Sequence, residues 1–135
     1  MLLTSCSAFK PTQLIAEPPL LQKWELQPGD QVANYPVTGG LGDISIALNG
    51  KTVYAPSDGD AYIDKRGCVY FASAETPAYF FRLCGLKSPK LGRLQARDAI
   101  ATAETLQFAA LLKQSDDKWA LVEPDKSLLE RMLKH

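Results

Sequence analysis

The sequence predicts an all-β fold, a small antiparallel β-sandwich or barrel followed by a short C-terminal helix. Short segments rich in β-branched and aromatic residues recur along the chain. Nine glycines and nine prolines among 135 residues supply many turns, which favours many short strands. The clearest helical pattern lies at the C-terminal end. A chain of this length is expected to form one domain that buries about two-thirds of its unfolded surface.

The stretch 39–59, GGLGDISIALNGKTVYAPSDG, carries the clearest strand signal. Residues 43–48 are mostly apolar, and residues 51–55 are rich in β-branched and aromatic types. Between them stand Asn49 and Gly50, a dipeptide typical of a two-residue hairpin turn. A Pro-Ser-Asp-Gly sequence follows, in the order that a tight turn uses. We therefore expect a β-hairpin here with a closing turn after it.

Further strands are expected on both sides of this stretch. Pro36 lacks an amide donor, so residues 31–37 are expected to form an edge strand. A second hairpin is expected from residues 98–102 and 105–112. The remaining strand-like segments are residues 60–64, 68–72, 78–84 and 119–122.

Residues 85–97 are expected to form a loop, because they contain proline, glycine and several basic side chains. The simple interpretation is a solvated loop. The alternative is a patch that contacts anionic lipid headgroups or an acidic partner. The basic residues concerned are Lys87, Lys90, Arg93 and Arg97.

Two cysteines face each other if the chain forms a hairpin centred on Thr76. Such a hairpin places Cys68 opposite Cys84, and the Cβ atoms of opposed residues lie about 4.5–5.5 Å apart, close to disulfide reach. The bridge closes a loop of about 15 residues and stabilises the fold by roughly 3 kcal/mol. The alternative is two buried free thiols. A disulfide needs an oxidising compartment, which predicts a location outside the cytoplasm, in the periplasm or on the lumenal side.

The N-terminus resembles a bacterial lipobox, because Leu3, Thr4 and Ser5 precede Cys6. The cysteine of a lipobox is lipidated and becomes the new N-terminus, so Cys6 is a candidate peripheral membrane anchor. A signal peptide also needs a basic segment and an apolar segment of about 7–15 residues. Neither is present before Cys6. Either the start lies upstream, or the match is incidental and the terminus is frayed.

The chain divides into three expected segments. Residues 1–19 hold the lipobox-like sequence and a proline-rich tether. Residues 20–124 form the β domain, and residues 125–135 hold the C-terminal helix. Asp125 is placed to cap that helix, whose apolar stripe is expected to dock on the sheet rather than on a membrane or partner. The stripe consists of Leu128, Leu129, Met132 and Leu133.

Charge and histidine content exclude several function classes. Fifteen basic and fifteen acidic residues give a net charge of zero, whereas nucleic-acid-binding proteins normally carry a basic excess. Nucleic acid is therefore not an expected partner. The single histidine is the last residue, His135. A Ser-His-Asp triad, a Cys-His pair or a histidine-based zinc site is therefore not expected.

Residues 36–124 carry a series of short motifs in a particular order. The most specific is GKTVYAPSDG at residues 50–59. The weaker ones are LGDI at 41–44, GCVY at 67–70, YFFRL at 79–83, GRLQARDAIA at 92–101, TLQFA at 105–109 and VEP at 122–124. This order resembles the lysostaphin/LytM-like zinc endopeptidases, which cut peptide cross-links in bacterial cell walls. The resemblance implies a barrel-sandwich of the duplicated hybrid motif type.

The zinc ligands of that family have no match in this chain. The family uses a first His, an Asp and the second His of His-x-His, whereas Leu41 and two glycines stand at the first position and Gln107 at the last. Phe81 or Arg82 replaces a further family histidine. Asp43 alone cannot hold zinc, which needs three protein ligands, and without zinc no water is activated. The resemblance implies a non-catalytic domain with no metal or cofactor, in which Asp43 is a turn carboxylate rather than a remnant ligand.

A second similarity is to biotinyl/lipoyl carrier domains, which share the V-x-A-P-x-x-G signature and a later G-x-x-V turn. A carrier needs a lysine at a hairpin tip. The corresponding turn near Ala103 and Glu104 has none. Lys51 follows a glycine and Lys65 stands shortly before one, but neither lysine has the flanking sequence pattern of a carrier lysine.

Three functions follow from these observations. The first is a non-catalytic LytM-like module that binds a protein partner or cell-wall glycopeptide in the groove of the former active site. The second is a structural accessory lipoprotein subunit of a membrane protein complex. The third is an enzyme that needs no histidine, although no basic neighbour is evident that would lower the pKa of a cysteine. The candidate groove residues are Asp43, Tyr54, Tyr79, Arg82, Thr105 and Gln107.

Overall fold

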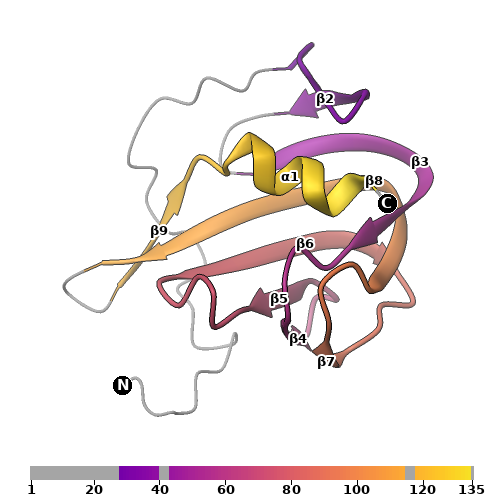
Figure 1. Cartoon of the computed structure of the whole chain (residues 1–135). Coiled ribbons are helices and arrows are strands. Elements are labelled where there is room, and N and C mark those ends of the chain that lie inside the picture. Colours follow the sequence, from indigo (N-terminus) through magenta and orange to yellow (C-terminus); the bar gives the residue numbers. More distant parts are fainter. Residues whose placement is uncertain (1–27, 40–42, 115–117, 135) are drawn as a thin grey trace.

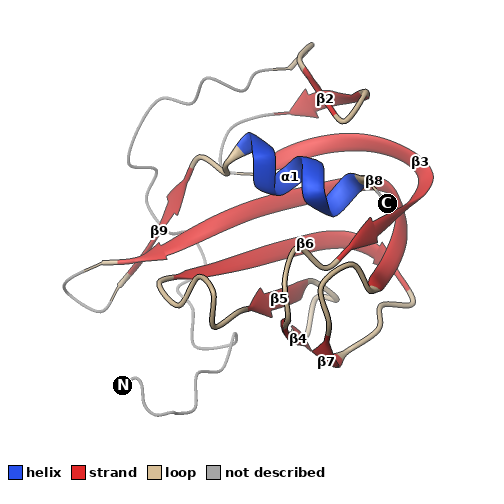
Figure 2. Ribbon diagram, in the orientation of Figure 1, coloured by secondary structure: helices blue, strands red, loops and turns tan. Residues whose placement is uncertain are grey.

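The computed structural model describes residues 28–39, 43–114 and 118–134, which form one antiparallel sheet and one helix (Figures 1 and 2). This confirms the predicted all-β class with a short C-terminal helix. The helix is α1 (Lys126–Leu133). The strands are β1 (Gln31–Val32), β2 (Tyr35–Gly39), β3 (Ile44–Tyr54), β4 (Gly59–Ile63), β5 (Val69–Ala72), β6 (Tyr79–Lys87), β7 (Gly92–Leu94), β8 (Ala99–Lys113) and β9 (Trp119–Val122).

The strands follow one another across the sheet in the order β1-β2-β3-β8-β6-β5-β4-β7, and β9 pairs with the far end of β8. Within the described ranges the edge strands β1 and β7 do not pair with each other, so the sheet is open. Three long strands, β3, β8 and β6, form its centre. They curve together, and α1 lies across the β3 and β8 side of the curve (Figure 1).

The two hairpins expected over residues 43–55 and 98–112 are wrong. Each stretch is one long strand, and the two strands pair with each other. β8 pairs with β3 before the Asn49-Gly50 dipeptide, at Ala47, and after it, at Lys51. Asn49 and Gly50 have φ values of 53° and 87°, so they form a bulge rather than a turn. A hairpin turn uses the same left-handed conformation. The dipeptide is a bulge here because β8 pairs with β3 on both sides of it.

The bulges of three neighbouring strands lie at one level and bend the sheet there. β8 shifts register against β3 between its pairs at Ala103 and Thr105, and against β6 on either side of Gly85. Gly85 has φ +89°, and a Cβ atom there would lie 2.3 Å from the carbonyl oxygen of Thr105. Only glycine fits this close approach. The aligned irregularities give the open sheet its curvature.

Two smaller expectations also need correction. The single edge strand expected over residues 31–37 is a tight hairpin of β1 and β2, turned by Ala33 and Asn34 with φ values of 51° and 71°. The loop expected over residues 85–97 contains the end of β6 and all of β7. Neither the β1–β2 hairpin nor β7 could be predicted from local composition. Short strands are stabilised by their pairing partners more than by their own propensity.

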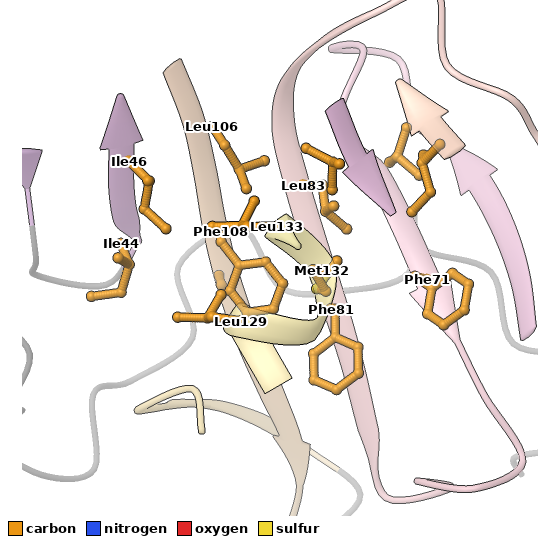
Figure 3. Close-up of a cluster of buried hydrophobic side chains, with 14 of the residues drawn as sticks. Ile44, Ile46, Phe71, Phe81, Leu83, Leu106, Phe108, Leu129, Met132 and Leu133 are labelled. Atoms are coloured by element: carbon orange, nitrogen blue, oxygen red, sulfur yellow. The ribbon is translucent and has the colours of Figure 1, made fainter. Parts of the chain in front are cut away.

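The core lies between the inner face of the sheet and α1 (Figure 3). Alternate residues of each strand point inward, and Ile44, Phe108 and Leu83 are completely buried there. Asp125 caps the helix as expected, and its carboxylate accepts a hydrogen bond from the Ser127 amide at 3.1 Å. The predicted apolar stripe docks on the sheet, because Leu128, Leu129, Met132 and Leu133 are all buried in the core cluster.

Candidate functional site

The candidate site lies on the outer face of the sheet, the face opposite α1. Strand alternation puts the neighbours of the core residues on this face. Four of the six predicted groove residues lie there: Asp43 before β3, Arg82 on β6, and Thr105 and Gln107 on β8. The structure brings these four together from three elements that are adjacent in the sheet.

A row of facing residues crosses the outer face through this site. Arg82 pairs with Tyr70 on β5 and with Ala109 on β8, and Tyr70 pairs with Tyr62 on β4. Asp43 lies on the other side of Ala109 and completes the row. Its position follows from the register of β3 and β8, in which the next residue, Ile44, pairs with Phe108. We call this set of side chains, Asp43, Arg82, Tyr70 and Tyr62, the polar row. Sequence reasoning did not include its two tyrosines, although the Cys68–Cys84 register with alternation already places Tyr70 opposite Arg82.

An ion pair joins Asp43 and Arg82, the two residues of the polar row that the sequence had singled out. Arg82 Nη2 donates to Asp43 Oδ1 at 2.9 Å, across 39 residues of sequence. Ala109 lies between them on β8, and its small side chain lets the arginine reach across the strand. The side chain of Arg82 is 12% exposed and that of Asp43 34%, so solvent reaches the carboxylate more than the guanidinium.

Charge and hydrogen bonding fix the ionisation of Arg82. Burial lowers the pKa of its guanidinium, but the Asp43 carboxylate and the Tyr70 hydroxyl raise it by more, so the net pKa lies above its ordinary value. Burial, with a smaller contribution from Asp60, raises the pKa of the Tyr62 hydroxyl. The row therefore keeps a fixed cation and a neutral phenol at physiological pH.

One donor of this cluster remains without an acceptor among the described residues. The Nε atom of Arg82 is buried and has no hydrogen-bond partner there. A buried polar atom of this kind usually has a partner, so this donor is an exception within the described part of the chain. Beside it, Gln107 and Thr105 are exposed and offer an amide and a hydroxyl on the same face.

The disulfide forms the next row of the outer face. Cys68 and Cys84 are bonded, with Cα atoms 4.3 Å apart, as expected from the hairpin centred on Thr76. Cys84 pairs with Gln107, which pairs on its other side with Ser45. The bond thus ties β5 to β6 directly beside the polar row. In this state neither sulfur is a thiolate, so neither serves as a nucleophile.

The other two predicted groove residues lie elsewhere. Tyr54 ends β3 beyond the bulge, paired with Ala99, away from the polar row. Tyr79 lies on the inner face, at an angle of 13° to Phe81 with ring centroids 6.3 Å apart. It lines a pocket of about 250 Å³ together with Phe81, Leu128 and Arg131. Thr76 Oγ1, another lining atom, is buried without a hydrogen-bond partner among the described residues.

Some predicted features lie outside the described ranges. Cys6, the whole segment 1–19, and Leu41 with its flanking glycines are among them. Within the described residues, no group of three or more His, Cys, Asp or Glu side chains is placed to hold a metal ion. No helix in the described part of the chain is long and apolar enough to span a membrane.

Comparison with known proteins adds no family to this geometry. No model of a known protein family matches the chain, and no curated protein matches it significantly.

Proposed function

We propose that the chain is a non-catalytic binding module that works outside the cytoplasm and holds cell-wall glycopeptide on the outer face of its sheet. The motif order that resembles LytM-like endopeptidases supports this ligand class. The absence of the family's histidines from the sequence supports binding without hydrolysis.

The observation that carries the proposal is the cluster around the Asp43–Arg82 pair. It combines a carboxylate, a fixed guanidinium, an amide and a hydroxyl on one face. Peptide and sugar groups present complementary donors and acceptors, and a site with several convergent polar groups fixes their orientation. The bond to Asp43 holds the guanidinium in place before ligand arrives, which lowers the entropy cost of binding.

The sulfur chemistry supports the proposed location. The Cys68–Cys84 disulfide is compatible with an oxidising compartment outside the cytoplasm. A lipid on Cys6 would tether the domain at a membrane in that compartment. Intact-mass analysis of the protein extracted from native membranes measures the lipid and the disulfide together.

Cosedimentation with purified peptidoglycan sacculi tests the proposed ligand. The full oxidised chain is expected to pellet with sacculi, and the double variant Thr105→Ala/Gln107→Ala to bind about tenfold less tightly, since two hydrogen bonds are lost. Both side chains are exposed, so the fold tolerates the change. The matched control, Gln95→Ala, removes an exposed amide directly after β7 and is expected to change binding less than about twofold.

Three results would count against the proposal. A chain that does not pellet with sacculi lacks the proposed ligand, and equal losses in the double variant and the control remove the outer face as the site. Stoichiometric zinc in the native protein, or release of soluble fragments from sacculi, contradicts a non-catalytic role.

A further inference from the structure

We infer that the β4–β7 edge of the sheet is a second binding surface, which lies against an anionic lipid bilayer. This surface, the β4–β7 patch, consists of Tyr62, Ile63 and Leu91 with Lys65, Arg66 and Lys90. It shares Tyr62 with the far end of the polar row but does not include Asp43, Thr105 or Gln107, and its partner is a membrane rather than glycopeptide.

Exposed apolar side chains single out this edge. Across the described residues, the large hydrophobic side chains that remain exposed are Tyr62 at 43%, Ile63 at 46% and Leu91 at 42%. Single exposed apolar residues are normal, but a cluster of them marks an interaction surface.

Strand pairing brings Tyr62 and Leu91 together on one face of this edge. Ala61 on β4 pairs with Gly92 on β7, and the two strands are antiparallel. Tyr62 follows Ala61 and Leu91 precedes Gly92. In an antiparallel pair these two positions are opposite each other, so Tyr62 and Leu91 are neighbours. Ile63 ends β4 and, as the next residue after Tyr62, lies on the opposite face of the strand, so the exposed apolar side chains flank the edge on both sides. Figure 1 shows β4 and β7 together at one end of the molecule, away from α1.

Basic side chains surround the apolar group. Lys65 and Arg66 form the turn directly after β4, and Lys90 precedes Leu91. All three are exposed. Arg66 approaches Asp64 only at 4.0 Å, and no ion pair with a described residue engages Lys65 or Lys90. Positive charge at this edge is therefore open to an external anion.

The turn that carries two of these charges is held in a fixed conformation. Asp64 Oδ1 accepts hydrogen bonds from the amides of Arg66 and Cys68, each at 2.9 Å. The Asp64 amide donates to the Cys68 carbonyl, and Cys68 is bonded to Cys84. A surface prepared in this way loses little conformational entropy when it binds.

The combination of side chains favours a membrane over a protein partner. Tyrosine with short aliphatic chains suits the boundary between headgroups and acyl chains, and surrounding lysines and arginines are attracted to anionic headgroups. Three apolar side chains are few for a stable protein interface, which normally has a larger buried core. The basic charge of the β4–β7 patch therefore favours an anionic bilayer as its partner.

Vesicle flotation tests the inference. The full oxidised chain with Cys6→Ser, which carries no lipid, is expected to bind phosphatidylcholine vesicles only when they contain phosphatidylglycerol, and to dissociate as salt rises. Lys65→Gln/Lys90→Gln and, separately, Tyr62→Ser/Leu91→Ser are each expected to weaken binding roughly tenfold. The matched control Lys51→Gln/Lys126→Gln removes the same charge from exposed sites elsewhere and is expected to change binding less than about twofold.

Failure to bind anionic vesicles overturns the inference, and so do equal losses in the patch and control variants. An unchanged affinity for neutral and anionic vesicles also contradicts it. Sacculus binding is also measured on Lys65→Gln/Lys90→Gln, whose residues lie outside the polar row, so failure of the membrane surface is distinguished from failure of the glycopeptide site.

Discussion

Phe108 and Gln107 are neighbours on β8, but they lie on opposite faces of the sheet. Phe108 is completely buried and packs against Phe81 with ring centroids 5.6 Å apart. Gln107 is exposed and sits between Ser45 and Cys84. The inner face is continuously apolar and covered by α1, whereas the outer face carries the polar row and the disulfide. The residues that hold the fold and those proposed to bind ligand therefore alternate along the same strands.

At this point of β8 the alternation separates stability from binding between adjacent residues. A substitution of Phe108 is expected to change the free energy of unfolding, and a substitution of Gln107 to change binding.

Phe108→Ala is expected to cost about 3–5 kcal/mol, because it leaves a cavity between β8, β6 and α1. Gln107→Ala, one residue away, is expected to change stability by less than about 0.5 kcal/mol. Urea denaturation of the two variants measures both values. Comparable losses in the two variants would remove the distinction between the faces.

The disulfide is the strongest expected contribution to stability from the outer face. Cys68→Ala/Cys84→Ala is expected to lose roughly 3 kcal/mol, because the unfolded chain regains the freedom that a loop of this size removes. Thermal unfolding with and without dithiothreitol measures the effect. The reductant should destabilise the native chain and leave the double variant unchanged, and a native chain insensitive to reduction contradicts the prediction.

The Asp43–Arg82 ion pair is expected to contribute less. Asp43→Ala leaves a largely buried guanidinium without its carboxylate and is expected to cost about 1.5–3 kcal/mol. Arg82→Met keeps the aliphatic stem and removes the charge, and the double variant completes a mutant cycle. A coupling free energy near zero between the two positions would show that the pair does not act as a unit.

The helix cap gives the smallest of these effects. Asp125→Ala removes the acceptor of the Ser127 amide and is expected to cost about 1 kcal/mol, whereas Asp125→Asn keeps an acceptor and is expected to lose less. Chemical denaturation of both variants checks the order. Equal losses would mean that the aspartate charge, rather than the hydrogen bond, stabilises α1.

Local sequence was enough for features whose partners are close in the chain. The Cys68–Cys84 pairing followed from a hairpin centred on Thr76, and α1 followed from a capping Asp125 with an apolar stripe. In both cases the interacting residues are separated by few positions. The chain between them therefore leaves few alternative arrangements.

Features that depend on strands far apart in the sequence could not be predicted from local sequence patterns. Asn49 and Gly50 adopt the left-handed conformation that a turn also uses, but β8 pairs on both sides of them and makes the dipeptide a bulge. The polar row has the same origin. Asp43 and Arg82 are 39 residues apart, and only the order β3-β8-β6 brings them together.

The most direct test of the central claim is photocrosslinking from the two sides of the domain. A benzoylphenylalanine residue replaces Gln107 on the outer face in one variant and Lys126 on α1 in the other, and native cells that express each variant are irradiated. We expect a glycopeptide adduct, identified by its mass, at position 107 and none at position 126. An adduct at position 126 with none at 107, or a protein adduct in place of glycopeptide, would contradict the account.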